Sequence, residues 1–427
     1  MSVAPDNITK LTDHLFRHES GKMVAVLSKL LGIRHIETAQ DIVQDTLLQA
    51  MNTWGFNGLP ENPSAWLMRV AKNKAIDFLR RQKKFSEISS GYAYLLQSEY
   101  SLGHTVQNMF LENEIADSQL RMIFACCHPA IPEESQIALT LKTMCGLSVQ
   151  EIARAFLAGE ETITKRIYRA KEKINSENIE LEVPMGTGLL PRLNTVLKCL
   201  YLLFNEGYNS SHPEQLIRED LCMEAMRLCH LLTEQKQTAY PRTKALLSLM
   251  CFQASRLSAR LDDRGNIVLL KYQDRKLWSW PLIQKGFEYL DGAAEPFEES
   301  PYHIEAAIAS LHAAAPSFEK TNWPRLLSLY DLLLKMNPSP VVSLNRAIVL
   351  SMVQGPEAAI NDIQNIPGIH SLLEKHYLFA ATLGELYSQL PHHTEACRYF
   401  EKAITLTQSP LEKNLLRKKI EDSTPKS

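Results

Sequence analysis

Residues Leu147–Ile174 read LSVQEIARAFLAGEETITKRIYRAKEKI, and this stretch has the pattern of two short helices around a tight break. Ser148 and Glu151 have the S-x-x-E spacing in which each side chain caps a backbone N–H of the other residue. We therefore expect the first helix to start at Leu147. Gly159 ends that helix, because glycine is a poor helix former.

The second half of the stretch predicts a basic helix, with Thr162 placed to cap its start. Apolar residues recur on one side of this helix at helical spacing: Ile163, Ile167, Ala170 and Ile174. The same helix carries five cations: Lys165, Arg166, Arg169, Lys171 and Lys173. Two helices joined by a short turn, the second basic on its outer side, match the helix-turn-helix layout of DNA-binding proteins. The alternative is a helical hairpin with a solvated basic face.

The composition predicts an all-α protein whose positive charge is gathered locally. The 427 residues have a formal net charge of −2, and 45% are hydrophobic and 22% charged, as in soluble globular proteins. Glycine is scarce, at 17 residues, and apolar residues recur at three- and four-residue spacing almost throughout. The length predicts roughly three domains. Any nucleic-acid-binding surface has to be local, because the chain as a whole is not basic.

The sequence shows no signal for a membrane or for export. No apolar run reaches the ~18 residues that a membrane helix needs. The start, MSVAPDNITKLTDHLF, lacks a basic region followed by an apolar core. The eight cysteines are scattered and form no C-x-x-C pair. We therefore expect a cytoplasmic protein with reduced thiols and no membrane partner.

Changes in pattern divide the chain into a helical block, a linker, a second block, a second linker and a long helical region. The expected bounds are residues 8–90, 91–115, 116–178, 179–188 and 189–427, in that order. Within the last region, WPRLLSLYDLLLKMNPSP (323–340) and TEACRYFEKAITLTQSP (394–410) each combine an aromatic residue, apolar residues at helical spacing and a proline stop. Both resemble the second helix of a tetratricopeptide (TPR) repeat, so we expect stacked helix pairs.

The first block predicts two more helices. AQDIVQDTLLQAM has one apolar stripe: Ala39, Ile42, Val43, Thr46, Leu47, Ala50 and Met51. AWLMRVAKNKAIDFLRRQKK (65–84) points apolar residues inward: Leu67, Val70, Ala71, Ala75, Phe78 and Leu79. Its opposite face is basic, and Trp54, Phe56 and Trp66 are close by in sequence. Proteins that bind single-stranded nucleic acid combine such cations, which follow the phosphate backbone, with aromatic rings on which bases stack. The alternative is that Trp66 belongs to the core and Asp77 only pairs with a nearby arginine.

These stretches resemble three parts of the bacterial extracytoplasmic-function (ECF) sigma factors, in the family's order and spacing. DIVQDTLLQAM looks like the polymerase-clamp helix, AWLMRVAKNKAIDFLRRQ like the promoter-melting helix, and residues 147–174 like the −35 recognition module. CLYLLFNEGYNSS and LYDLLLKMNPSPVVSLNRAI resemble an ECF subgroup with a long TPR-like C-terminal extension. The resemblance implies an all-α fold: a sigma domain 2 bundle, a sigma domain 4 helix-turn-helix and a TPR-like helical-repeat domain.

The resemblance also implies partners and residue roles. The factor would bind core RNA polymerase, at its β′ clamp helices and β flap, and direct it to −35/−10 promoter DNA. Polymerase docking is assigned to Asp41, Gln44 and Asp45. Binding and melting of the −10 element are assigned to Asn57, Trp66, Arg69, Lys72, Asn73, Asp77 and Arg80. Binding of the −35 element is assigned to Thr162, Thr164, Lys165, Arg166, Tyr168, Arg169 and Lys173. Glu160 and Glu161 depart from this pattern, because they would oppose close approach of phosphates.

Other motifs give weaker signals. CCHP (126–129) invites a metal, but adjacent cysteines on a helix point in different directions, so packing at a helix end is the preferred interpretation. No G-x-S-x-G or H-E-x-x-H motif is present, and we expect neither an enzyme nor a cofactor. The TPR-like domain is expected to bind a protein or peptide, and to regulate the sigma domains either by clamping them or by keeping them active. The alternative function is an interaction scaffold whose sigma-like half has lost promoter recognition.

Overall fold

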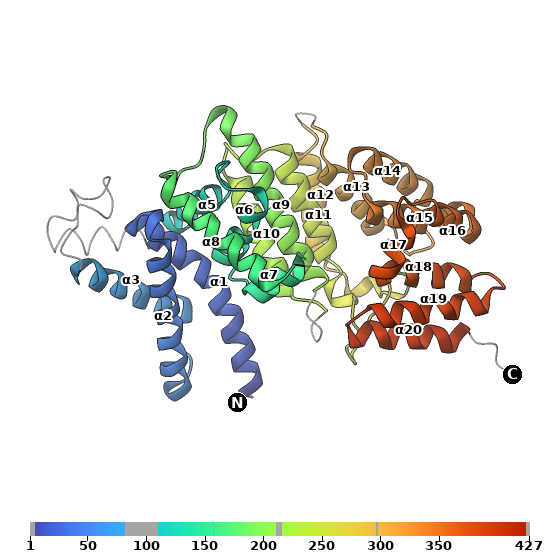
Figure 1. The fold of residues 1–427 in the computed structure, drawn as a ribbon, viewed down its shortest axis with the longest axis horizontal. Helices are drawn as coiled ribbons and strands as arrows, with labels where there is room; N and C mark the ends of the chain where they lie inside the picture. Colours follow the sequence, from blue (N-terminus) through green and yellow to red (C-terminus); the bar gives the residue numbers. More distant parts are fainter. Residues whose placement is uncertain (1–4, 82–109, 157, 211–215, 296–297, 424–427) are drawn as a thin grey trace. The chain divides into compact units, whose positions relative to one another are not determined.

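The computed structural model describes residues 5–81, 110–156, 158–210, 216–295 and 298–423. These residues form helices and connecting turns, with no strand among them beyond one isolated bridge between Leu261 and Ile267 (Figure 1). The expectation of an all-α fold is confirmed. The chain divides into two compact units, each described by itself: residues 1–207 with 223–238, and residues 208–222 with 239–427.

The first unit begins with three helices, α1 (Pro5–Leu31), α2 (Ile36–Asn57) and α3 (Pro63–Arg81). Residues at spacings of three and four bury one stripe of α2: Ile36, Ala39, Ile42, Val43, Thr46, Ala50 and Trp54. The expected stripe is correct over most of its length, but placing Met51 in it is wrong, since 58% of Met51 is exposed. The stripe runs from Ala50 to Trp54, and Met51 lies on its flank.

Four further helices follow: α5 (Glu112–Cys126), α6 (Glu133–Met144), α7 (Val149–Ala155) and α8 (Glu160–Ser176). The capping box is formed, because Ser148 N donates to Glu151 Oε2 at 2.6 Å and Glu151 N donates to Ser148 Oγ at 3.1 Å. With Ser148 as the cap, α7 starts two residues after the expected Leu147. Helix α5, in contrast, starts earlier than expected, at Glu112, inside the segment expected to be a linker. The rest of that linker lies largely outside the described residues.

Helix α1 connects the two helical blocks of the first unit. It packs against α2 and α3 of the first block and against α5 and α6 of the second block. At Gly21 the contact is so close that a Cβ atom would lie 2.2 Å from the carbonyl oxygen of Met144. Ion pairs between described residues that join the blocks include Arg17–Glu151 at 3.2 Å, Lys29–Glu114 at 2.8 Å, Lys29–Asp117 at 3.0 Å and Lys171–Glu37 at 3.3 Å.

The remaining α-helices of the described chain are α9 to α20. The first five are α9 (Leu189–Tyr208), α10 (Glu219–Glu234), α11 (Pro241–Ala254), α12 (Trp280–Gly292) and α13 (Pro301–Ala314). The last seven are α14 (Trp323–Met336), α15 (Pro340–Gln354), α16 (Pro356–Gln364), α17 (Ile369–Lys375), α18 (Tyr377–Ser388), α19 (His393–Leu406) and α20 (Pro410–Ser423). Helix α13 packs mainly on α11, and from α14 onward each helix packs mainly on its neighbours in sequence, as in stacked helical repeats.

Candidate nucleic-acid interface

Helix α8 presents a polar, basic face opposite its buried side. Ile163, Ile167, Ala170 and Ile174 are buried, as expected. Six of the seven residues assigned to the −35 element are exposed: Thr162, Thr164, Lys165, Tyr168, Arg169 and Lys173. The seventh, Arg166, is half-buried and forms an ion pair with Glu134 on α6. The structure therefore brings the assigned residues together on one helix, with Arg166 held on its inner edge.

The start of α8 differs from the expectation. The helix begins at Glu160, so Thr162 lies inside the first turn and is not the cap. The carbonyl of Gly159 accepts from the N–H groups of Thr162 and Ile163, at 3.0 and 3.2 Å, which places Gly159 at the cap position. Glu160 and Glu161 suit this position, because acidic residues interact favourably with the positive end of the helix dipole.

Most cations of α8 are engaged by carboxylates of the protein itself. Lys165 pairs with Glu161 at 2.6 Å, and Lys173 pairs with Glu177 at 2.9 Å. Both pairs are exposed, and exposed pairs contribute little to stability, so a phosphate can replace the carboxylate. Arg169 is exposed and makes no ion pair with any described residue.

Tyr168 also lies on this face. Its hydroxyl donates to Glu172 Oε1 at 3.2 Å, and this hydrogen bond, with the charge of Glu172, raises the pKa of Tyr168. The hydroxyl of Tyr168 is thus held on this face by Glu172.

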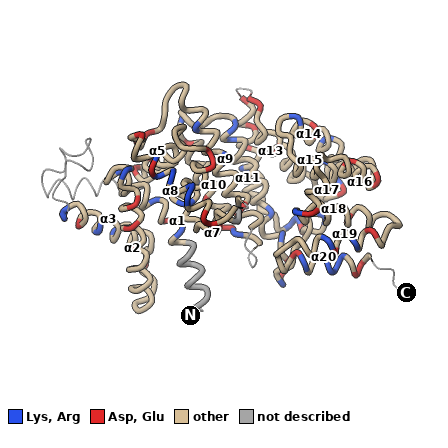
Figure 2. The backbone as a smooth tube through the Cα atoms, viewed as in Figure 1, with Lys and Arg blue, Asp and Glu red and all other residues tan. Residues whose placement is uncertain are grey.

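Helix α3 carries the second basic face (Figure 2). Arg69, Asn73, Asp77 and Arg80 are exposed, and Lys72 is half-buried. Asp77 and Arg80 lie 4.0 Å apart at helical spacing. None of the other four cations of the helix forms an ion pair with a described residue: Arg69, Lys72, Lys74 and Arg81.

The aromatic residues beside α3 separate into core and surface. Trp54 is buried, and its ring meets Trp66 edge to face at 5.4 Å between centroids. Trp66 is half-buried, so it has one packed edge and one accessible edge. Phe56 is 92% exposed and lies next to the exposed Asn57 at the end of α2. Phe56 was not among the assigned residues, and only its exposure distinguishes it from the neighbouring tryptophans.

The third assigned surface lies on α2. Asp41, Gln44 and Asp45 are exposed on one face of the helix. Leu48 and Met51 continue this face at helical spacing, and more than half of each is exposed. The face thus combines acidic and apolar side chains, which is typical of a protein-docking surface. The apolar half was missed because an apolar residue in a helical pattern is normally assigned to the core.

Both basic faces belong to segments that match known protein families. Residues 15–85 match Sigma-70 region 2, and residues 121–174 match Sigma-70, region 4. A segment of 138 residues, 32% of this chain, is 30% identical to the ECF RNA polymerase sigma-E factor of Escherichia coli (strain K12) and covers 72% of that protein. The same figures hold for the sigma-E factor of Salmonella typhimurium (strain LT2). The chain belongs to the ECF sigma factors.

The rest of this sigma factor is a C-terminal extension. Residues 192–294 match a family of unknown function, DUF6596. Uncharacterized protein R00370 of Rhizobium meliloti (strain 1021) is 36% identical over 404 residues, 94% of each chain, so it shares the extension as well. No solved structure matches the chain. Among the described residues, no helix is long and apolar enough to cross a membrane. Sigma-70 regions 2 and 4 are not enzyme families.

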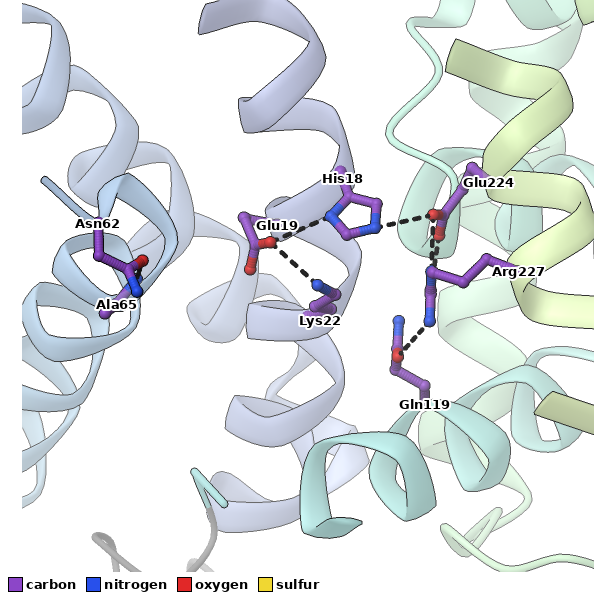
Figure 3. Close-up of polar contacts among 8 residues, drawn as sticks. All are labelled: His18, Glu19, Lys22, Asn62, Ala65, Gln119, Glu224 and Arg227. Carbon is purple, nitrogen blue, oxygen red and sulfur yellow. Dashed lines mark hydrogen bonds and ion pairs between the residues drawn. The ribbon is translucent and has the colours of Figure 1, made fainter. Parts of the chain in front are cut away.

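A polar network connects α1 of the sigma factor to α10 of the extension, within the first unit (Figure 3). Lys22 Nζ donates to the buried Glu19 at 2.9 Å, and His18 Nδ1 lies 3.0 Å from the same carboxylate. The other ring nitrogen of His18 lies 3.5 Å from Glu224 on α10. Burial would raise the pKa of Glu19, but the hydrogen bond with His18 and the charge of Lys22 outweigh it and lower that pKa to about 2.

The network continues from α10 to α5. Arg227 donates to both carboxylate oxygens of Glu224, at 2.8 and 2.9 Å, and to Gln119 Oε1 on α5 at 3.2 Å (Figure 3). Glu224 is therefore shared by His18 on α1 and Arg227 on its own helix. The extension thus contacts both helical blocks of the sigma factor. These residues are far apart in sequence, and no local motif could have identified them.

The two cysteines of the CCHP motif are packed in the interior of the protein. Cys126 and Cys127 are buried, and all eight cysteines of the chain are free thiols. His128 Nδ1 accepts from the backbone N–H of Ala130 at 3.2 Å, and burial lowers the pKa of His128. In the described part of the chain, no group of three or more His, Cys, Asp or Glu residues has the arrangement of a metal site.

Proposed function

We propose that this sigma factor binds core RNA polymerase and directs it to promoters with specific −35 and −10 elements. The observation that carries the proposal is the pair of exposed basic faces, on α3 and α8, within segments that match Sigma-70 regions 2 and 4. Loss of these faces would favour the alternative, a scaffold that binds polymerase without reading DNA. Both faces are intact, so promoter binding is the better supported function.

Helix α8 is assigned to the major groove of the −35 element. Arg169 and Lys165 can donate to guanine edges, and each bidentate pair is worth ~1–3 kcal/mol of discrimination between bases. Thr162, Arg166 and Lys173 lie nearer the ends or inner edge of the face and are assigned to phosphates. Thr164 Oγ1 donates to the carbonyl of Glu160 at 2.9 Å, and its oxygen remains an acceptor for DNA or water.

Helix α3 and the end of α2 are assigned to the melted −10 strand. Arg69, Lys72 and Arg80 would follow the phosphates, and Asn57, Asn73 and Asp77 offer polar groups to flipped bases. Phe56 adds an exposed ring on which a base can stack. The face of α2 formed by Asp41, Gln44, Asp45, Leu48 and Met51 is assigned to the β′ clamp helices of the polymerase. The β flap is the corresponding partner of the second block.

The packed first unit represents a closed state in this proposal. Lys171 of α8 contacts Glu37 at 3.3 Å and Gln40 at 2.9 Å on α2, so the two DNA-reading blocks touch. Elements centred at −35 and −10 are about 25 base pairs apart, which is about 85 Å along B-DNA. The blocks must therefore separate to read both elements. Because Glu224 and Arg227 of the extension hold both blocks, the extension is assigned a clamping role in cis.

Transcription in vitro tests promoter recognition. Bacterial core polymerase is supplied with fragmented genomic DNA, with and without the sigma factor, over several rounds of initiation. We expect discrete new transcripts that disappear in the Lys165→Ala/Arg169→Ala variant and persist in the control Lys418→Ala, an exposed lysine of α20. Binding of core polymerase without any transcript from the wild-type chain would instead support the scaffold function.

A distance measurement tests the closed state. Spin labels on introduced cysteines at Gln49 of α2 and Glu172 of α8, two exposed positions outside the assigned contacts, report the separation of the two blocks by pulsed electron resonance. The native thiols are buried except for Cys397, which is replaced by serine. We expect one short distance in the free protein and a longer one with core polymerase and promoter DNA. An unchanged distance in an actively transcribing complex would refute the clamping role.

A further inference from the structure

Three arginines of the second unit lie together without an acidic partner. Arg256, Arg260 and Arg275 are each half-buried, and none forms an ion pair with a described residue. Partly buried arginines are normally paired, because desolvation of a charge is unfavourable. Here burial lowers the pKa of Arg260 and of Arg275. The cluster therefore carries positive charge that no ion pair with a described residue neutralises.

Aromatic rings surround these guanidinium groups. The Cζ atom of Arg260 lies 3.9 Å from the centre of the Tyr208 ring, and that of Arg275 lies 4.3 Å from the centre of the Trp278 ring. Arg256 lies between the same two rings, at 5.7 and 5.9 Å from their centres. Cation–π contacts hold the arginines in place. Hydrogen bonds use part of the N–H donor set: Arg256 Nη2 donates to the hydroxyl of Tyr208 and, at 3.3 Å, to Gln253 Oε1, and Arg260 Nη1 donates to the backbone carbonyl of Tyr208.

Arg275 also has a structural role, and this role leaves part of its donor set unused. Its Nη1 atom donates to the carbonyls of His312 and Ala315 at the C-terminal end of α13, where a positive charge suits the helix dipole. Its Nη2 atom is buried and has no hydrogen-bond partner. The capping role thus explains one edge of the guanidinium group and not the other.

Three further nitrogen atoms in the same cluster are buried without a partner: Trp278 Nε1, Trp323 Nε1 and His312 Nδ1. The rings of His312 and Trp323 meet edge to face at 5.7 Å between centroids. Burial, followed by the charges of Arg256 and Arg275, lowers the pKa of His312 to about 4, so the imidazole is neutral at physiological pH. Glu319 is exposed, and its charge acts on Arg275 without forming an ion pair.

We infer that Arg256, Arg275 and the indoles of Trp278 and Trp323 form a binding site for a small carboxylate. A carboxylate has only acceptors, matches the planar guanidinium fork and would accept from the indole N–H groups. The aromatic rings suit an apolar group attached to that carboxylate. The site lies in the extension, and it does not depend on the promoter-binding proposal.

Fluorine NMR of the full-length chain labelled with 5-fluorotryptophan tests the site. The five tryptophans give five signals, which single Trp→Phe variants assign. Sodium acetate and sodium benzoate are the probes, with sodium chloride and sodium phosphate at equal ionic strength as comparisons. We expect saturable shifts of Trp278 and Trp323. Trp54 is the internal control, since its Nε1 atom is also buried without a partner but its ring contacts Phe16 and Trp66 instead of an arginine.

Variants then decide the role of the arginines. Arg256→Gln should raise the concentration of half-maximal shift about tenfold or more, as loss of a charge-assisted contact does. Arg264→Gln, at an exposed position nearby, should leave it unchanged. If thermal unfolding shows that Arg256→Gln is misfolded, Trp323→Phe is the second variant. It removes the N–H donor together with one of the two indole rings, and it should raise the Trp278 midpoint about two- to tenfold.

Two outcomes overturn the inference. No saturable shift of Trp278 and Trp323 with acetate or benzoate would mean that the cluster only stabilises the fold. Shifts with phosphate alone would mean an anion site that does not take carboxylates.

Discussion

Helices α3 and α8 are both amphipathic and both basic, but they differ in how many of their cations are paired with carboxylates of the protein. On α8, four of the five cations have a carboxylate partner within the protein: Lys165, Arg166, Lys171 and Lys173. On α3, only Arg80 has such a partner among the described residues. Under the proposed function, the cations of α3 are available to bind phosphate, whereas those of α8 must first exchange their own carboxylates. This difference favours weak binding to duplex DNA outside the polymerase complex.

The contrast between α3 and α8 depends on the packing of the first unit. The largest effect that we expect is therefore a loss of stability when a buried charge of α1 is removed. A pKa of Glu19 lowered from its ordinary 4.5 to about 2 corresponds to roughly 3 kcal/mol of stability at neutral pH. We expect Glu19→Gln to lower the free energy of unfolding of the first unit by about this amount. Denaturant unfolding followed by circular dichroism measures it, with Glu61→Gln at an exposed position as the control.

The pH dependence of this effect has a definite sign. Since the folded-state pKa of Glu19 is lowered, its contribution is fully present above the ordinary pKa and is lost as the pH falls toward 2. The difference between wild type and Glu19→Gln should therefore be constant near neutral pH and shrink between about pH 4.5 and 2. A difference that stays constant over this window would show that the variant acts through packing alone.

The next prediction compares the loss of DNA binding on removal of two cations of α8, one without an ion pair and one with an ion pair. Arg169→Ala should weaken binding to a −35 duplex by ~1–3 kcal/mol and relax base preference at one position, if the side chain reads a guanine. Lys173→Ala should weaken all sequences alike and reduce the dependence on salt. Fluorescence anisotropy with matched and scrambled duplexes distinguishes the two. Equal losses on both duplexes for Arg169→Ala would assign it to phosphate.

Sequence reasoning predicts the parts of this comparison that depend on local periodicity. The buried stripe of α8 and the capping box at Ser148 and Glu151 follow from spacings of three and four residues, and the structure contains both. Helix starts are less certain, because glycine and threonine both occur at caps. The chain uses Gly159 where Thr162 was expected.

Which cations form ion pairs could not be predicted from the sequence, because these pairs join residues that are far apart along the chain. Arg166 and Glu134 are 32 positions apart, and Lys171 and Glu37 are 134 positions apart. The exposure of Met51 has the same origin: the positions of α1 and α3 beside α2 decide which of its apolar residues are covered. The assigned DNA and polymerase contacts remain predictions, since they require the partners.

A smaller effect is expected from the aromatic residue at the end of α2. Phe56→Ala should weaken binding of a single-stranded −10 oligonucleotide by about 1 kcal/mol, the low end for loss of one stacking ring. Binding to a −35 duplex should not change. Trp280→Ala, which removes an exposed ring of α12, is the control for a general effect of exposed aromatics. Loss of duplex binding in Phe56→Ala would show that the substitution disturbs the fold.

The smallest effect tests directly whether internal pairing limits α8. Glu160→Gln and Glu161→Gln each remove one negative charge from the first turn, and each loses a similar favourable interaction with the helix dipole. Only Glu161→Gln also releases Lys165, which pairs with Glu161 at 2.6 Å. Both variants should bind duplex DNA slightly more tightly, because less negative charge faces the phosphates. Glu161→Gln should gain more, by about two- to fivefold, since an exposed pair is worth up to about 1 kcal/mol.

The salt dependence separates the two contributions in this last pair. A released lysine that binds a phosphate adds one displaced counterion, so the slope of log K against log salt should steepen by about 0.9 in Glu161→Gln relative to Glu160→Gln. Filter binding at four salt concentrations measures both slopes. Equal slopes would mean that Lys165 reaches phosphate even in the wild-type chain. In that case the ion pairs of α8 would exist in the free protein but would not weaken its binding to DNA.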